Sequence, residues 1–346
     1  MASSKMYYSD YLQLNKILHA QTPESGKRKT SAHDEMLFII THQAYELWFK
    51  QIIHELNSVR EIFRNPINDN SPAMQIAVHR LKRIVTILGI AVEQINVMET
   101  MTPLDFLDFR DLLRPASGFQ SIQFKIIEAL MGLKMKDRHA GNYYISQLRK
   151  EDMQKIMLAE KEKSLLDAIN AWLERMPFFR VKEFWPDYKP VTGNDLKNHV
   201  FWKEYRKVYQ QSLLKEEWDN INAFDEVFFS RNSDNVRKFS AKACRSALFI
   251  MLYRDYPLLQ LPFQLLNTLL DIDEMLATWR YRHMNMVHRM IGMRVGTGGS
   301  SGKEYLRGAL EKHYIFGEIA DLSTFLIERR RLPKLSTVLE KHLSFV

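Results

Sequence analysis

Three histidines and one arginine stand where their side chains could do chemistry. His283 and His288 lie in the stretch TWRYRHMNMVHRMIGMRVGTGGSSG, and His42 lies among aromatic residues in FIITHQAYELWF. A neutral imidazole can ligate a metal ion, anchor a polar group of a ligand or take up a proton near neutral pH. Arg110 lies in the mostly apolar stretch TPLDFLDFRDLLRPASGFQS. A guanidinium is costly to bury without an anionic partner, and a carboxylate matches its forked donor geometry.

His283 and His288 cannot both bind one ion from the same helix. They are five residues apart, so on a helix they point about 140° away from each other. A lone histidine on an apolar stripe is usually a packed core residue, but one helical imidazole is also enough to hold a haem iron. The methionines nearby fill any core and need no cofactor. His283 shares its stripe with Trp279, Met286, Val287 and Met290, whereas His288 lies nearer Tyr281 and Met284.

The rest of the sequence excludes several other kinds of metal site. Cys244 is the only cysteine, which excludes cysteine-ligated zinc, iron–sulfur clusters, covalently attached haem and an intrachain disulfide. A di-iron carboxylate bundle needs Glu-x-x-His on two helices, and none of the eleven histidines has a glutamate three residues before it. The metalloprotease motif His-Glu-x-x-His is also missing from the sequence.

The glycine-rich turn GTGGSSGK (296–303) departs from the phosphate-binding pattern. Thr297 stands where the first glycine of G-x-x-x-x-G-K-[ST] is needed, and Glu304 replaces the final serine or threonine. The turn also follows a predicted helix, not a strand. It still offers flexible backbone, free N–H groups and a threonine hydroxyl that could close over a small ligand.

His42 has an aromatic setting of its own. On a helix it shares one face with Phe38, Tyr45 and Phe49. A core histidine is the plainer interpretation of that pattern. The alternative is a flat heteroaromatic ligand, which would need one polar anchor among aromatic walls.

The elements that must position these residues are predicted to be helices. Glycine (13) and proline (11) are scarce in 346 residues, so long elements with few breaks are expected. The stretch 36–63 has neither residue, and Ser31 with the acids that follow it is typical of a helix start. We therefore predict one all-α domain over residues 1–346, a large helical bundle with a small helical insertion at 134–238. Further helices are predicted near 6–20, 73–100, 104–113, 118–132, 161–175, 239–254, 260–292, 303–313 and 335–343.

Charge and hydropathy narrow the functional classes. Lys and Arg total 49 and Asp and Glu 41, a net charge of +8, but the basic residues are spread among acids. Because no nucleic-acid motif accompanies them, nucleic acid is not an expected partner. No apolar run approaches the ~20 residues that cross a bilayer, and the N-terminus lacks the apolar core of a signal peptide. We expect a soluble, cytoplasmic protein that does not bind a membrane.

Together these stretches resemble the tryptophan 2,3-dioxygenase family. The match covers about a third of the chain in the family's order, and it is weak or missing in 134–238 and beyond 328. The matching segments are YSDYLQL (8–14), HDEMLFIITHQAYELWFKQI (33–52), ETMTPLDFLDFRDLLRPASGFQSIQF (99–124), LLDIDEMLATWRYRHMNMVHRMIG (269–292), GTGGSSGKEYLR (296–307) and DLSTFLI (321–327).

The resemblance implies an activity and a role for each residue. It implies a haem b enzyme that opens the indole ring of L-tryptophan with O₂, giving N-formyl-L-kynurenine in the first step of the kynurenine pathway. It also implies a homotetramer in which the arm 1–20 docks on a neighbouring subunit.

The family pattern also gives each site residue a role. His283 is the iron ligand, and His42 is the distal catalytic histidine that accepts the indole N–H. Phe38 and Phe106 form the walls of the indole pocket. Arg110 binds the substrate carboxylate, Thr297 its ammonium group, Tyr11 lines the pocket, Tyr8 reaches it from the neighbour, and Ser117, Gly118, Trp279 and Lys125 lie around the haem.

One departure and three alternatives accompany that interpretation. Lys125 follows SIQF where the family pattern leads us to expect an arginine near a haem propionate, and a lysine supplies the charge without the fork. A relative acting on another indole is one alternative, and the pair Arg110 and Thr297 favours a free amino acid over it. An O₂ or haem sensor would need no such clamp. A purely structural helical protein would not retain haem on purification.

Overall fold

A computed structural model describes residues 5–138, 148–185, 193–230, 237–294 and 314–345, and all the regular structure in these ranges is helical. The all-α prediction is therefore confirmed. The α-helices are α1 (Tyr8–Tyr11), α2 (Leu14–Leu18), α3 (Glu24–Lys27), α4 (Glu35–Ile62), α5 (Pro72–Glu93), α6 (Ile95–Met98), α7 (Pro103–Arg110), α8 (Ile122–Met131), α10 (Lys150–Lys161), α11 (Leu165–Arg175), α12 (Val200–Ser212), α13 (Asn220–Phe229), α14 (Ala241–Leu252), α15 (Pro257–Ile291), α17 (Gly317–Asp321) and α18 (Thr337–Ser344). The short 3-10 helices are Asp111–Leu113, Gly118–Gln120, Met135–Asp137, Lys182–Phe184, Gly193–Asn198, Lys215–Glu217, Leu322–Phe325 and Arg329–Arg331.

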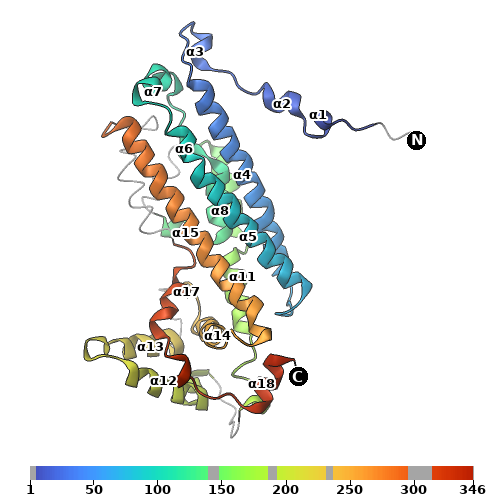
Figure 1. Cartoon of the computed structure of the whole chain (residues 1–346), viewed down its shortest axis with the longest axis vertical. Helices are drawn as coiled ribbons and strands as arrows, with labels where there is room; N and C mark the ends of the chain where they lie inside the picture. The colour runs from blue at the N-terminus through green and yellow to red at the C-terminus, as the bar shows by residue number, and fades with distance from the viewer. Residues whose placement is uncertain (1–4, 139–147, 186–192, 231–236, 295–313, 346) are drawn as a thin grey trace.

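The long helices α4, α5 and α15 form a bundle with α6 and α8, and α5 packs against both α4 and α15 (Figure 1). At one end of the bundle α7 lies beside the last turns of α15. Toward the other end, α15 contacts α14, α17 and α18. Helix α13 packs against α14, and α12 lies near α13 (Figure 1). The N-terminal arm with α1 and α2 extends away from the bundle.

Apolar residues at helical spacing explain the bundle. On α4, Phe49, Ile52, Leu56 and Val59 are almost wholly buried and recur every three or four residues. Burying one such side chain contributes roughly 1.5–3 kcal/mol, so this single stripe outweighs the weak helix propensity of β-branched residues. The face therefore fixes how α4 turns toward α5 and α8.

Local signals set the ends of the helices that surround the candidate site. Thr102 caps α7 through a reciprocal pair of bonds with Asp105, and Pro103 occupies the first turn, where a missing N–H costs nothing. Helix α15 runs on past Pro262 and ends before Gly292, whose φ of 58° is a left-handed conformation that favours glycine.

Gly132 ends α8 at a position where no other residue fits. Its φ is +129°, and a Cβ atom added there would lie 2.7 Å from the Cβ atom of Leu166. Since α8 lies between α4 and α10, this stop fixes how far α8 extends along α4.

Four sequence expectations need correction or fall outside the structure. The helix expected at 6–20 is two short helices, because Gln13 adopts a left-handed φ of 52° between them. The helix expected to start at Ser31 starts at Glu35, whose carboxylate accepts hydrogen bonds from the backbone N–H groups of Glu24 and Ser25 at 2.7 and 2.9 Å. The helix expected at 161–175 starts only at Leu165, since Ser164 caps it after a break. The helix expected at 303–313 lies outside the described residues.

In the described part of the chain, no single helix is long and apolar enough to cross a membrane. One pair of segments, Pro72–Met98 and Pro103–Leu113, meets that test of length and composition together, although it is bent by 91°.

Candidate active site

His42 lies on α4 with its orientation fixed by the preceding turn. Its Nδ1 is 2.7 Å from the carbonyl oxygen of Phe38, and the two rings lie 4.1 Å apart. A carbonyl can only accept, so Nδ1 donates and Nε2 of the neutral ring is left as an acceptor. Burial lowers the pKa of His42, against hydrogen bonding to Phe38 and the charge of Glu46. At pH 7 the ring is therefore neutral.

His283 lies near the end of α15 and is stacked on Trp279. The two rings are 5.0 Å apart and within 5° of parallel. Burial and the nearby His42 imidazole lower the pKa of His283 to about 4, so it too is neutral at pH 7. Its Nδ1 is buried and makes no hydrogen bond within the described residues. Two neutral imidazoles, from α4 and α15, are thus close enough to influence each other.

Aromatic rings from four helices enclose this end of the bundle. The ring of Phe38 lies 5.8 Å from Phe106 and 5.6 Å from Phe109, both on α7. On the His283 side the ring of Phe124, from α8, lies 4.9 Å from Trp279. A small apolar cluster separate from the main core supports them, formed by Ile95, Met98, Met101, Phe109, Met286 and Met290.

The other residues predicted on the substrate side lie on α7 and the turn after it. Arg110 is the last residue of α7 and is buried, as is its neighbour Phe109. Ser117 is half-buried, and it caps the 3-10 helix Gly118–Gln120 through reciprocal bonds with Gln120. The structure thus places Phe106 and Arg110 on one short helix, and Ser117 with Gly118 on the turn that leads into α8.

Lys125 is buried within a cluster of charges on α8 and α15. Burial lowers its pKa to about 7, while Glu128 raises it and Arg138 lowers it. The Glu128 carboxylate accepts a hydrogen bond from Arg280 at 2.7 Å and forms an ion pair with Arg138. Arg280 directly follows Trp279 in α15. Three cationic residues therefore surround one fully buried carboxylate beside the helix turn that carries His283.

The donor atoms fit a single-imidazole cofactor better than a protein-caged ion. No group of three or more His, Cys, Asp or Glu residues that could hold a metal ion occurs within the ranges that the structure covers. His283 instead offers one neutral imidazole with a buried, unbonded nitrogen, set among aromatic rings. That is the donor set that haem iron accepts. Lys125, Arg138 and Arg280 share the charged cluster with the carboxylates of Glu128 and Glu160, and basic side chains at this place suit a cofactor that carries carboxylates.

Two predicted site residues, Tyr8 and Tyr11, are not brought to this region within one chain, and a third lies outside the described residues. The side chains of Tyr8 and Tyr11 lie on the projecting arm and are 74% and 70% exposed. Thr297 and the whole turn GTGGSSGK lie outside the described residues. His288 is half-buried one turn beyond His283, and its Nδ1 makes no hydrogen bond with any residue described.

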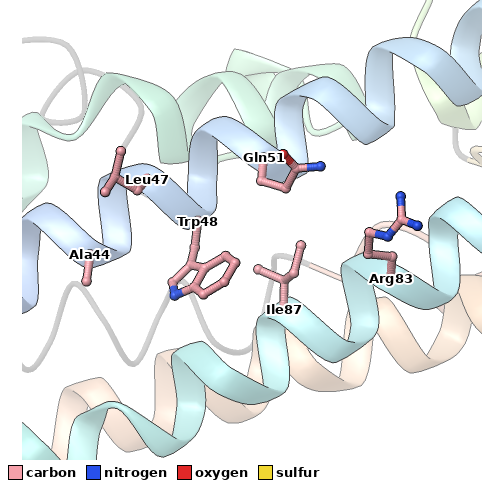
Figure 2. Close-up of a pocket in the computed structure, with 6 residues that line it drawn as sticks. All are labelled: Ala44, Leu47, Trp48, Gln51, Arg83 and Ile87. Carbon is pink, nitrogen blue, oxygen red and sulfur yellow. The ribbon is translucent and has the colours of Figure 1, made fainter. Parts of the chain in front are cut away.

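A second concave feature lies elsewhere on the same helices. An open groove of about 610 Å³ runs between α4 and α5, and it is lined by Ala44, Leu47, Trp48, Gln51, Arg83 and Ile87 (Figure 2). None of these residues belongs to the aromatic enclosure around His42 and His283. The Arg83 guanidinium at its polar end is already 2.7 Å from the Glu55 carboxylate, so the groove offers mainly apolar surface.

Glu46, Glu128, Arg138 and Arg280 were not predicted from the sequence. Most of their contacts join residues that are distant in sequence, such as Glu128 and Arg280, which are 152 residues apart. One local signal existed for Glu46: it follows His42 by four residues, the spacing of neighbours on one helix face.

Comparisons with known proteins all identify the same family. A family model described as tryptophan 2,3-dioxygenase matches residues 1–326. A tryptophan 2,3-dioxygenase of Bdellovibrio bacteriovorus is 45% identical, over 98% of this chain and 98% of its own. Those of Dictyostelium discoideum and Xenopus tropicalis are each 41% identical, over 99% and 98% of this chain and 89% and 86% of their own. The similarity therefore extends over nearly the whole chain, including 134–238.

Proposed function

The chain belongs to the tryptophan 2,3-dioxygenase family, and from that premise we propose that it uses haem b to open the indole ring of L-tryptophan with O₂. The product is N-formyl-L-kynurenine, in the first step of the kynurenine pathway. The observation that best supports this function is the pair of neutral imidazoles, His42 and His283, that face one aromatic enclosure. The enzyme is cytoplasmic, in keeping with its single, buried cysteine.

His283 holds the haem iron, and Trp279 packs flat behind its ring. When bound, haem supplies the iron at which O₂ becomes able to attack the electron-rich double bond of the indole. Lys125 would pair with the carboxylates of that group from the charged cluster on α8, and Ser117 and Gly118 would line the pocket beside it. Imidazole must be neutral to ligate iron, and burial lowers the pKa of the free His283 ring to about 4, so the ring is neutral at pH 7.

The substrate is oriented by side chains of α4 and α7. His42 accepts the indole N–H at Nε2, the nitrogen that its bond to Phe38 leaves as an acceptor. An indole N–H is far too weakly acidic for imidazole to ionise it, so this bond positions the ring and is not an obligatory proton transfer. Phe38 and Phe106 enclose the ring and exclude water. Arg110 binds the carboxylate and Thr297 the ammonium group, which together select a free amino acid.

The working assembly is a homotetramer. The arm exposes Tyr8, Tyr11 and Leu18, each more than half exposed, although chain ends of this kind are ordered only when they dock on something. The groove between α4 and α5 also leaves Leu47 54% exposed, which is the kind of apolar surface that a second copy covers. Tyr8 and Tyr11 therefore reach the pocket of a neighbouring subunit.

An absorption spectrum of the haem-loaded ferrous protein tests the function directly. L-tryptophan should change the spectrum, and addition of O₂ should then give N-formyl-L-kynurenine. Tryptamine, which lacks the carboxylate, should be a poor substrate because Arg110 has nothing to bind. Equal turnover of both compounds would contradict the amino-acid clamp. Retained haem and bound O₂ without consumption of L-tryptophan would favour a sensor instead.

A further inference from the structure

Glu46, on α4, is connected to the start of α8 through its carboxylate. The Ser121 hydroxyl donates to Oε1 at 2.6 Å, and the Gln123 amide donates to Oε2 at 2.8 Å. The same Gln123 amide nitrogen lies 2.7 Å from the backbone carbonyl oxygen of Glu46. Ser121 also caps α8 by accepting from the N–H of Phe124. Both carboxylate oxygens of Glu46 therefore accept hydrogen bonds from the first residues of α8 and its cap.

This contact lies between the two sides of the proposed pocket. Glu46 is four residues after His42, so the two side chains are neighbours on one face of α4. Ser121 directly follows the 3-10 helix Gly118–Gln120, which Ser117 caps. The hydrogen bonds of Glu46 therefore connect the helix that carries His42 to the residue that follows the Ser117 turn.

The contact is strongest with a carboxylate. Two donors, a hydroxyl and an amide, converge on the two oxygens of Glu46. A glutamine in its place would present an NH₂ group to one of them, so that the Ser121 hydroxyl would have to accept in place of donating, or the Gln123 amide would have to turn over. Bonds to a charged acceptor are also about twice as strong as neutral ones.

We propose that Glu46 is a positioning residue of the reaction, which holds the Ser117–Ser121 turn at a fixed place relative to His42. The inference depends on the proposed function, since it assigns these two features to opposite parts of one substrate and oxygen pocket. Loss of the contact moves the turn relative to the indole anchor, and a shift of about 1 Å in such an arrangement lowers turnover by up to about 100-fold.

The experiment uses the full-length haem-loaded protein and a double-mutant cycle. Glu46→Gln removes the charge of the contact, Gln123→Leu removes one of its donors, and the double variant carries both changes. Glu61→Gln is the matched control on α4, because within the described residues that carboxylate pairs with the exposed Arg64. The measurements are kcat and KM for L-tryptophan and the C–O stretching band of the ferrous CO complex, which reports on the pocket around the sixth ligand.

Each single variant should keep its haem, lower kcat about 10-fold with a smaller change in KM, and shift or broaden the CO band. The double variant should be little worse than the more severe single variant, because both changes act on one contact. The inference is wrong if Glu46→Gln behaves like Glu61→Gln, or if the effects of the two changes on kcat simply multiply. If the wild type binds haem but does not consume L-tryptophan, the proposed function fails while the CO bands still test the contact.

Discussion

His42 and His283 are both neutral near pH 7, but they are held differently. The ring of His42 is fixed by a hydrogen bond to its own helix, whereas the buried Nδ1 of His283 has no such bond within the described residues. An imidazole that is stacked but not hydrogen-bonded has a nitrogen available for a metal. His42 also keeps an acceptor at Nε2, and the buried Nδ1 of His288 is equally unbonded in the described part of the chain, so the proposal that His283 holds the iron rests on the family pattern.

Replacing His283 and His288 one at a time should show which of the two histidines binds the haem iron. His283→Ala should abolish the five-coordinate haem spectrum, because it removes the proposed iron ligand. His288→Ala should leave that spectrum largely unchanged. Absorption spectra of the two reconstituted ferrous variants make the comparison, and the opposite result would assign the iron to His288.

Lys125 should give the apoprotein a measurable pH dependence. Its pKa is lowered to about 7 by burial, whereas the unfolded chain titrates near its usual 10.5. Between these values the unfolded state binds the extra proton, so this residue makes the free energy of unfolding rise with pH, and the gain is lost as pH falls through 7. Lys125→Met should lose up to about 3 kcal/mol of this rise between pH 7 and 9.5.

Urea unfolding of the wild type and Lys125→Met at both pH values provides that measurement. Other groups titrate in the same range, so the difference between the two proteins isolates Lys125. In the haem-loaded wild type the slope should become smaller, because nearby carboxylates stabilise the charged amine. An identical slope with and without haem would exclude Lys125 from the propionate contact.

At the scale of elements, helix α8 connects α4, which carries His42, to α15, which carries His283. Its first turn is bound to α4 through Glu46, and its last turn is bound to α15 through Glu128 and Arg280. The Gly132 stop then fixes its length. The helix that carries His42 and the helix that carries His283 are therefore spaced partly by two carboxylates on either side of α8.

Glu128→Gln should be strongly destabilising. It leaves Arg280 and Arg138 buried beside a neutral amide, and removal of one partner from a buried ion pair typically costs about 3–5 kcal/mol. Glu61→Gln, whose partner is exposed, should cost less than about 1 kcal/mol. Denaturant unfolding of both variants measures the two losses in the free energy of unfolding. A cost below 1 kcal/mol for Glu128→Gln would show that α8 is held mainly by apolar packing.

The helices themselves could be predicted from sequence because their signals are local. The unbroken periodic stretch 36–63 lies in α4, although the predicted start signal at Ser31 lies four residues before its first residue, and 260–292 became α15 within three residues at each end. The arm was wrongly predicted as one helix, because no residue near Gln13 indicates that its φ is positive. The contact between Glu46 and Ser121 spans 75 residues and depends on how α4 meets α8, so no pattern in either segment predicts it.

At the scale of the whole molecule, the proposed site is completed by a second chain. Removal of residues 1–15 should lower activity and weaken the assembly together, while haem stays bound through His283. Mixing this truncated protein with the His283→Ala variant should restore some activity, because intact arms of one chain then serve haem-bearing pockets of the other. Activity assays and size-exclusion chromatography of the mixtures test this. A fully active, monomeric truncated protein would refute it.

Cys244 has a practical consequence for following that arm. It is the only thiol in 346 residues, it is buried, and burial raises its pKa to about 12. Thiol reagents attack the thiolate, so the folded wild type should be almost inert to maleimides at neutral pH. A cysteine introduced at Met6, whose side chain is 74% exposed, would be the one reactive handle per protomer. A dye or spin label attached there would report where the arm lies without any need to remove native cysteines first.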